Sequence, residues 1–181
     1  MNRIFILFLF SLVTWGTVQA QRNNYIHLSG NAGVVINSER DKKFGIGGTV
    51  SWLAQDIFIA QNPANYISLT LKAFNNPYGE GKLLSSIMND KNDGFNYLMA
   101  LAGYRITQQG ISEGFFVEPR VGIALGASGY TGFAFAPQAG YAYRNFDFAV
   151  YCDMGFGWEN SAVQKKNFFT PGLSIGYNFG L

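Results

Sequence analysis

Apolar and polar residues alternate with a period of two along much of the chain, and the C-terminal segment 169–181 shows this most clearly. Its odd-numbered positions carry Phe, Pro, Leu, Ile, Tyr, Phe and Leu, and its even-numbered positions carry Thr, Gly, Ser, Gly, Asn and Gly. Successive side chains of a β-strand point to opposite faces of the sheet. The segment therefore predicts a strand with one large apolar face and one small polar face.

The same alternation occurs about eight times in all; the other segments are 25–36, 44–52, 67–73, 95–106, 115–125, 133–143 and 146–158. Such lengths suit tilted membrane strands, which need about 9–11 residues. A face turned to water would carry Lys, Glu and Thr, whereas the polar face here is mostly Gly, Ala and Ser. Small side chains suit the crowded interior of a narrow barrel. The pattern predicts an all-β fold: a closed, up-and-down antiparallel transmembrane β-barrel of eight strands.

Segment 95–106 fits a strand in either of two facings. In one, the even-numbered side chains from Leu98 to Ile106 point outward, and in the other the odd-numbered side chains from Phe95 to Leu101 do. We favour the first facing because it turns Arg105 inward.

The connections alternate in character as an outer-membrane barrel requires, with short periplasmic turns and long outer loops. Arg144 and Asn145 form a tight turn expected on the periplasmic side, and the polar or long connections 37–43, 75–94 and 159–168 are expected outside. Connection 55–65 is long for a periplasmic turn, which an extension of the strand through residues 57–59 would explain. Residues 81–88 carry apolar side chains at helical spacing and predict a short lid over the mouth of the barrel rather than an external contact.

Composition excludes two other classes of protein. Of the 181 residues, 17% are aromatic and only 13% are charged, whereas disordered chains are poor in aromatic residues and rich in charge. The chain also has 22 glycines, which argue against a helical bundle because glycine disfavours helix interiors.

The N-terminus has the pattern of a secretory signal peptide. Asn2 and Arg3 precede an apolar run at 4–13, and Val18, Gln19 and Ala20 form a small-residue cleavage site. The run is shorter than the ~20 residues that a membrane helix needs. We expect residues 1–20 to be the signal peptide and 21–181 to be the barrel domain. Cleavage would remove Arg3, one of the 13 basic residues, and would leave 12 basic against 11 acidic residues. Because this net charge is close to zero, no nucleic-acid partner is expected.

With this pattern, residues 25–181 resemble the small eight-stranded outer-membrane β-barrel proteins of Gram-negative bacteria. In that family the last strand carries an assembly signal, in which a polar residue, a glycine, a hydrophobic residue and a hydrophobic C-terminal residue stand at fixed spacing. Ser174, Gly176, Phe179 and Leu181 fill these positions, although the family more often ends in Phe. The resemblance implies a location in the cell outer membrane, contact with outer-membrane lipids, and recognition of the last strand by the barrel-assembly machinery.

Charged side chains that the alternation directs inward are the candidate functional residues. They are Lys72, Arg105, Glu118, Arg120, Asp147 and Asp153. The interior of an eight-stranded barrel is just wide enough for side chains to fill, and isolated charges there would be costly. We therefore expect a salt-bridged plug rather than a gated pore or a proton relay, with Arg120 and Asp153 near mid-height as candidates to pair.

His27 and Ser29 stand two residues apart on the first strand, which resembles the His-any-Ser pair of outer-membrane lipid A deacylases, also eight-stranded barrels. In those enzymes the pair lies late in the chain and faces lipid, whereas the alternation here directs it inward, with no acid evident nearby. A serine nucleophile needs a base oriented by a carboxylate. We expect these residues to line the lumen without catalysing a reaction.

No other motif of the sequence suggests chemistry. One His and one Cys do not make a metal cluster, and residues 45–48 continue the strand alternation instead of forming a phosphate loop. Cys152 has no disulfide partner and is expected to face lipid as a small hydrophobe. We expect no metal and no cofactor.

The expected function is therefore that of a non-enzymatic outer-membrane protein with a structural, adhesive or accessory role and an external ligand that the sequence does not identify. A narrow pore for small solutes, a lipid-modifying outer-membrane enzyme and a soluble secreted barrel are the alternatives.

Overall fold

The computed structural model describes residues 24–38, 43–57, 59, 62–75, 96–126, 129–159 and 164–181. The expected signal peptide at 1–20 and the expected lid at 81–88 lie outside the described residues and stay predictions. In the described part of the chain, no helix is long and apolar enough to cross a membrane.

Eleven β-strands form a single sheet in the described residues. They are β1 (Tyr25–Val34), β2 (Ile36–Ser38), β3 (Phe44–Gln55), β4 (Tyr66–Asn75), β5 (Tyr97–Thr107), β6 (Glu113–Glu118), β7 (Arg120–Gly126), β8 (Thr131–Phe135), β9 (Gln138–Tyr143), β10 (Phe146–Gly157) and β11 (Gln164–Gly180).

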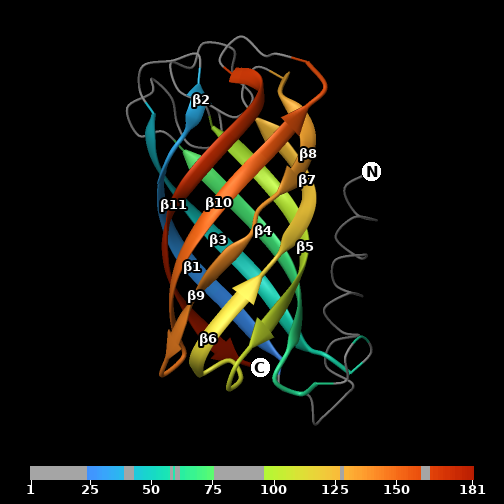
Figure 1. Ribbon diagram of the computed structural model, residues 1–181, viewed down its shortest axis with the longest axis vertical. Coiled ribbons are helices and arrows are strands. Elements are labelled where there is room, and N and C mark those ends of the chain that lie inside the picture. The colour runs from blue at the N-terminus through green and yellow to red at the C-terminus, as the bar shows by residue number, and fades with distance from the viewer. Residues whose placement is uncertain are drawn as a thin grey trace, which may run out of the picture.

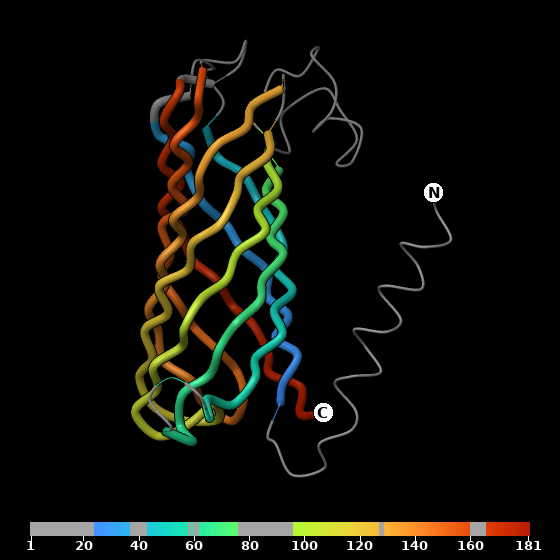
Figure 2. Tube along the Cα trace, turned by 90° about the vertical axis from the view of Figure 1, so that its right-hand side faces the viewer, coloured from blue at the N-terminus to red at the C-terminus, as the bar shows by residue number. Residues whose placement is uncertain are grey.

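These strands make eight spans, because three spans are each divided in two. The divided spans are β1 with β2, β6 with β7, and β8 with β9. Neighbouring spans pair in chain order, and β11 pairs with β1 to close the ring. Figures 1 and 2 show the tilted strands wrapping around one barrel. The structure confirms the predicted fold class.

Proline explains two of the divisions, since it has no N–H to donate to the ladder. The Tyr104 N–H donates to the Pro119 carbonyl at 3.2 Å, and the Cys152 N–H donates to the Pro137 carbonyl at 3.1 Å. Neither proline can return the second bond of the pair. The register nevertheless continues across Pro119 and across Pro137, so each of these two spans acts as one strand that lacks one hydrogen bond. At β2 the register with β11 shifts instead.

The outer surface of the barrel is apolar. Leu71, Phe115 and Leu173 each expose more than 60% of their surface. Most other large apolar residues at the outward-pointing positions of the strands are exposed too. Soluble proteins rarely expose an apolar surface of this extent. The band is the lipid-facing surface of a membrane-spanning barrel.

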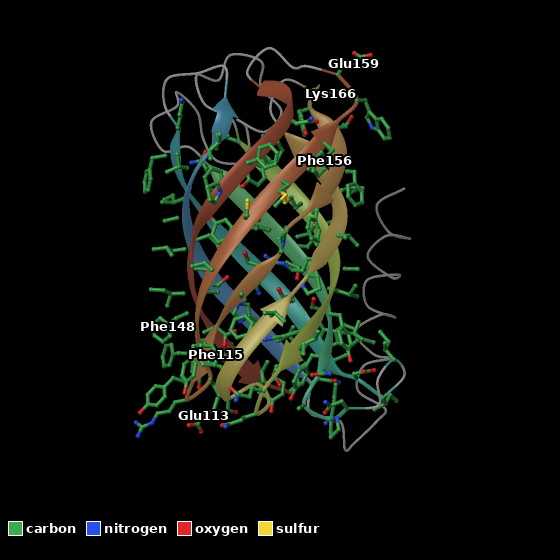
Figure 3. The ribbon with its side chains drawn as sticks, viewed as in Figure 1. Glu113, Phe115, Phe148, Phe156, Glu159 and Lys166 are labelled. Atoms are coloured by element: carbon green, nitrogen blue, oxygen red, sulfur yellow. The ribbon has the colours of Figure 1, made fainter. Side chains whose placement is uncertain are left out.

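Charged residues lie at the two ends of this band. In Figure 3, Phe115 and Phe148 project from the wall, Glu113 lies at the lower end of the barrel, and Glu159 and Lys166 lie at the upper end. The lower end also holds the C-terminus (Figure 2).

The structure settles the facing of segment 95–106. The side chains of Tyr97, Met99 and Arg105 are buried, whereas Ala102 and Ile106 are exposed. The favoured facing, with the even-numbered residues outward, is confirmed.

Two of the turns at the lower end differ in kind. Arg144 and Asn145 have φ angles of 49° and 69°, the two positive values of a type I′ hairpin turn. The expected extension of the strand through residues 57–59 is wrong, because β3 ends at Gln55. The Asp56 N–H instead donates to the Asn65 carbonyl at 2.8 Å, and the Asp56 carboxylate accepts the Ile59 N–H at 2.7 Å, so this connection is a folded turn.

Closure of the ring depends on the last residues of the chain. Gly180 pairs with Tyr25 and Phe179 pairs with Ile26, at the start of a ladder that runs to Gly172 and Gly33. The assembly signal that the sequence predicts lies in this same strand.

Deletion of residues 179–181 should therefore leave the chain unfolded in the periplasm, because closure of the ring needs the last strand and the predicted assembly signal lies in it. The measurement is the amount of protein in the outer-membrane fraction that runs faster on a gel when it is not boiled. A truncated chain that inserts at the level of the full chain would show that the assembly signal is misassigned.

Candidate functional site

The structure buries all six charged side chains that the alternation directs inward. Each exposes at most 2% of its surface. They come from β4, β5, the β6/β7 span and β10, and they comprise three cations and three anions: Lys72, Arg105 and Arg120, with Glu118, Asp147 and Asp153. Within each strand, these charged residues occupy the same alternate positions as the small polar residues, and alternate side chains point to the same face of the sheet. They therefore point into the barrel.

Asp153 is the centre of one cluster. The Lys72 ammonium lies 2.7 Å from its Oδ2 and donates to its Oδ1 at 2.9 Å, and the Tyr97 hydroxyl donates to its Oδ2 at 2.8 Å. The same ammonium lies 3.3 Å from the centre of the Tyr151 ring. The carboxylate thus has a cation and a hydroxyl as partners, and the cation also faces an aromatic ring.

Asp147 is the centre of a second cluster, nearer the lower end of the barrel. Arg105 Nη2 donates to its Oδ2 at 2.5 Å, and Asn178 Nδ2 donates to its Oδ1 at 3.0 Å. His27 Nδ1 lies 3.3 Å from Oδ2 and 3.0 Å from Asn178 Oδ1. The Arg105 guanidinium also lies 3.7 Å from the centre of the Phe116 ring.

Arg120 and Glu118 occupy the β6/β7 span between these clusters. Arg120 Nε donates to the Ala136 carbonyl at 2.8 Å, and Glu118 Oε2 accepts a hydrogen bond from Gln138 at 2.8 Å. The expected pairing of Arg120 with Asp153 is wrong. Ala136 lies in the β8/β9 span, between the spans of Arg120 and Asp153, and its carbonyl accepts the hydrogen bond from Arg120. Asp153 pairs instead with Lys72, which comes from β4 on the opposite side of the barrel.

An aromatic layer fills the lumen above the charges. The Phe74 and Tyr97 rings stack at 5.0 Å, and Phe168 lies 4.9 Å from Tyr97 and 5.5 Å from Tyr130. Burial raises the pKa of Tyr130 to about 12, so its hydroxyl is a neutral donor, and it bonds the Lys166 carbonyl at 3.0 Å. Below the charges, Leu53, Tyr66 and Ile111 form a smaller apolar cluster. The interior is thus filled in three layers.

Glycines on neighbouring strands make room for the large interior side chains. A Cβ at Gly155 would overlap the Phe168 ring, and one at Gly103 would lie 2.6 Å from Arg120 Cγ. Exposed Gly30 on the outer wall has no atom within 4 Å of such a Cβ. At these two positions, a glycine therefore stands directly beside a large interior side chain on the paired strand.

His27 does have an acid beside it, so the expectation of none nearby is wrong. His27 lies on β1 and Asp147 on β10, and β11 lies between these two strands. Asn178 of β11 contacts both the His27 and the Asp147 side chains. Among the described residues, the hydrogen bonds and ion pairs of His27 go to Asn178 and Asp147, and none goes to Ser29. Two residues on one strand face stand about 6.8 Å apart. The pair therefore lacks the nucleophile-to-base contact that catalysis requires.

Several partners in these clusters could not be singled out from the sequence. Tyr97, Gln138 and Asn178 share the inward parity, but nothing in the pattern distinguishes them from other lumen residues. Cys152 lies on the outer side of the wall, as expected, and is half-buried there.

The Lys72 and Asp153 pair can be tested by a double-mutant cycle. Lys72→Met and Asp153→Leu should each destabilise the barrel by about 3–5 kcal/mol, because each leaves a buried charge without its partner. The double variant should recover part of this loss, which is the signature of contacting sites. The measurement is the denaturant midpoint of unfolding in micelles, with exposed Lys43→Met as the control. Strictly additive losses would show that the two side chains do not interact.

The packing of glycine against the aromatic layer gives a second test. Gly155→Ala should lower the unfolding midpoint, because overpacking a filled interior costs about 1–3 kcal/mol. Gly30→Ala, which adds the same methyl group to the outer wall, should not lower it. Equal midpoints for the two variants would contradict the close fit at Phe168.

No protein-family model and no curated protein sequence matches this chain. Among solved structures, the chain is similar to Neisserial surface protein A (NspA), with a TM-score of 0.54 and 10% sequence identity over 86% of this chain and 97% of NspA. It is also similar to Ail, the attachment invasion locus protein of Yersinia pestis, solved in complex with the heparin analogue sucrose octasulfate; the TM-score is 0.48 and the identity 16%, over 87% of this chain and 99% of Ail. At such identities the likeness to NspA concerns the fold alone. The chain has the fold of the small eight-stranded outer-membrane barrels, as the sequence resemblance implied.

Proposed function

We propose that the protein is a non-enzymatic outer-membrane barrel with a salt-bridged plug, and that it has a structural, adhesive or accessory role carried by its outer end. The observation that supports this most directly is the filled interior. Three buried cations and three buried anions share the lumen with an aromatic layer and a smaller apolar cluster. Side chains of this size are enough to fill the lumen of an eight-stranded barrel.

Energetics favour a static plug over a gate. A buried charge that loses its partner is strongly destabilising, and each carboxylate at the centre of a cluster has two or more partners. Opening a path would require several of these contacts to break together. The network of Lys72, Arg105, Glu118, Arg120, Asp147 and Asp153 is therefore proposed as a structural element, with no catalytic residue and no cofactor.

The outer end is the part of the molecule left to interact with partners outside the cell. The end with the C-terminus and the tight Arg144–Asn145 turn is the periplasmic one, because outer-membrane barrels have short periplasmic turns. The opposite end receives the longest connection, between Asn75 at the end of β4 and Tyr97 at the start of β5. We propose that an external ligand, whose chemistry is open, meets this end, while the wall contacts outer-membrane lipids and the last strand meets the barrel-assembly machinery.

Conductance across a planar lipid bilayer tests the plug. The purified barrel should give no discrete conductance steps under conditions in which a known porin conducts, because side chains fill its lumen. Steady steps from the native protein whose size changes in Lys72→Met would instead support the alternative of a narrow pore for small solutes through the charged layer.

A further inference from the structure

A recess of about 380 Å³ opens on the outer wall, where the β6/β7 span, the β8/β9 span and β10 lie side by side. The outward side chains that line it are small or β-branched: Val117, Pro119, Pro137, Ala139, Val150 and Cys152. Apart from the Cys152 thiol, none of them carries a polar group. The recess is therefore an apolar dent in the lipid-facing surface.

The dent follows from the order of side-chain sizes along two neighbouring strands. The outward positions of the β8/β9 span are Phe133, Phe135, Pro137, Ala139, Tyr141 and Tyr143, and those of β10 are Phe146, Phe148, Val150, Cys152, Met154 and Phe156. Both runs are large at the two ends and small in the middle. The register pairs Ala139 with Val150 on one side and with Val117 on the other. The small side chains of the neighbouring strands therefore lie side by side. They form a hollow with aromatic side chains above and below it.

Below the recess, the outer wall carries first aromatic residues and then, at its periplasmic end, two charged residues that we call the charged foot, Arg144 and Glu113. The Phe115 and Tyr141 rings meet edge to face at 5.0 Å, directly below the recess. At the foot, the exposed Arg144 guanidinium lies 5.3 Å from the centre of the Tyr143 ring, and the register partner of Tyr143 is Glu113. Both signs of charge therefore lie at the periplasmic end of the same stretch of wall, where Figure 3 shows Glu113 below Phe115 and Phe148.

The height of the recess above this foot matches a lipid chain. Ala139 lies four positions before Tyr143 in β9, which is about 14 Å along the strand. Because the strands of such barrels tilt by about 35–45°, this corresponds to about 10–11 Å in height. The hydrocarbon core of a bilayer is about 30 Å thick, so one leaflet spans about 15 Å. With Arg144 at the head-group level, the recess lies in the inner part of the periplasmic leaflet, within reach of an acyl chain.

We propose that this stretch of wall binds one phosphatidylethanolamine molecule of the periplasmic leaflet. Its phosphate lies at Arg144 and its ammonium near Glu113, and one acyl chain runs past the Phe115 and Tyr141 rings and ends in the recess at Ala139. A lipid fits better than a second copy of the chain for two reasons. The recess is continuous with the lipid-facing band, and a foot with both signs of charge complements a zwitterionic head group.

Native mass spectrometry of the barrel, refolded in micelles with palmitoyl-oleoyl-phosphatidylethanolamine, tests the proposal. The native chain should retain one lipid after detergent exchange. Ala139→Phe, which fills the recess, should lose it, whereas Ala73→Phe, a matched change at a half-buried outward alanine of β4, should keep it. Faster migration of the unboiled protein on a gel confirms that each variant is folded. If Ala139→Phe does not fold, Cys152→Phe fills the same recess from β10.

The head-group contact has its own test. Arg144→Asn keeps a residue that tolerates the left-handed turn conformation and should lose the retained lipid, while the change of an exposed lysine at the other end, Lys43→Asn, should not. Three results would overturn the proposal: a native barrel that retains no lipid, equal loss from Ala73→Phe and Ala139→Phe, or a dimer that Ala139→Phe abolishes, which would identify the occupant as a second copy.

Discussion

A backbone inside a bilayer has no water to satisfy its N–H and C=O groups, so the protein itself must complete every rung of the wall. The pairing of β11 with β1 supplies the last of these rungs and joins the two ends of the described chain, from Tyr25 with Gly180 to Gly33 with Gly172. Once the ring is closed, the parity of a residue decides its surroundings, lipid or lumen. A slip of one residue in β10 would put Asp147 in hydrocarbon and Phe148 among the charges, and this constraint fixes the register of every span.

The interior meets a second constraint, because charges removed from water need partners within reach. Two carboxylates solve this in the same way. Asp153 and Asp147 each accept hydrogen bonds from a cation and from a neutral donor, the Tyr97 hydroxyl in one cluster and the Asn178 amide in the other. The aromatic layer covers these polar groups from above. At the lower end, Asn178 continues the network to the Asn145 carbonyl in the turn, beside the apolar cluster of Leu53, Tyr66 and Ile111. Gly155 and Gly103 leave the space that the Phe168 and Arg120 side chains occupy, since a Cβ at either position would overlap them.

The sequence could predict the wall but not the contacts across the lumen. Alternation is a local property, and it identified the spans, the buried face and five of the six interior charges. For Arg105 the pattern left the facing open, and the cost of a charge in lipid decided it. Partners are decided by which side chains meet from distant spans. Lys72 and Asp153 are 81 residues apart, and no local signal favours that pair over Arg120 with Asp153. The same holds for His27 and Asp147, and for the turn after Gln55, where the Asp56 carboxylate closes a connection that the alternation predicts as a longer strand.

The balance of charge inside the barrel has an electrical consequence. A potential across a membrane acts on an unpaired elementary charge with about 2.3 kcal/mol per 100 mV, which is how charged helices in voltage sensors are driven to move. The formal charges of Lys72, Arg105 and Arg120 cancel those of Glu118, Asp147 and Asp153. Displacing the six together along the barrel axis would therefore involve no net electrical work. A field across the membrane can reorient the dipoles of the individual pairs, but it exerts no net force on the plug as a whole.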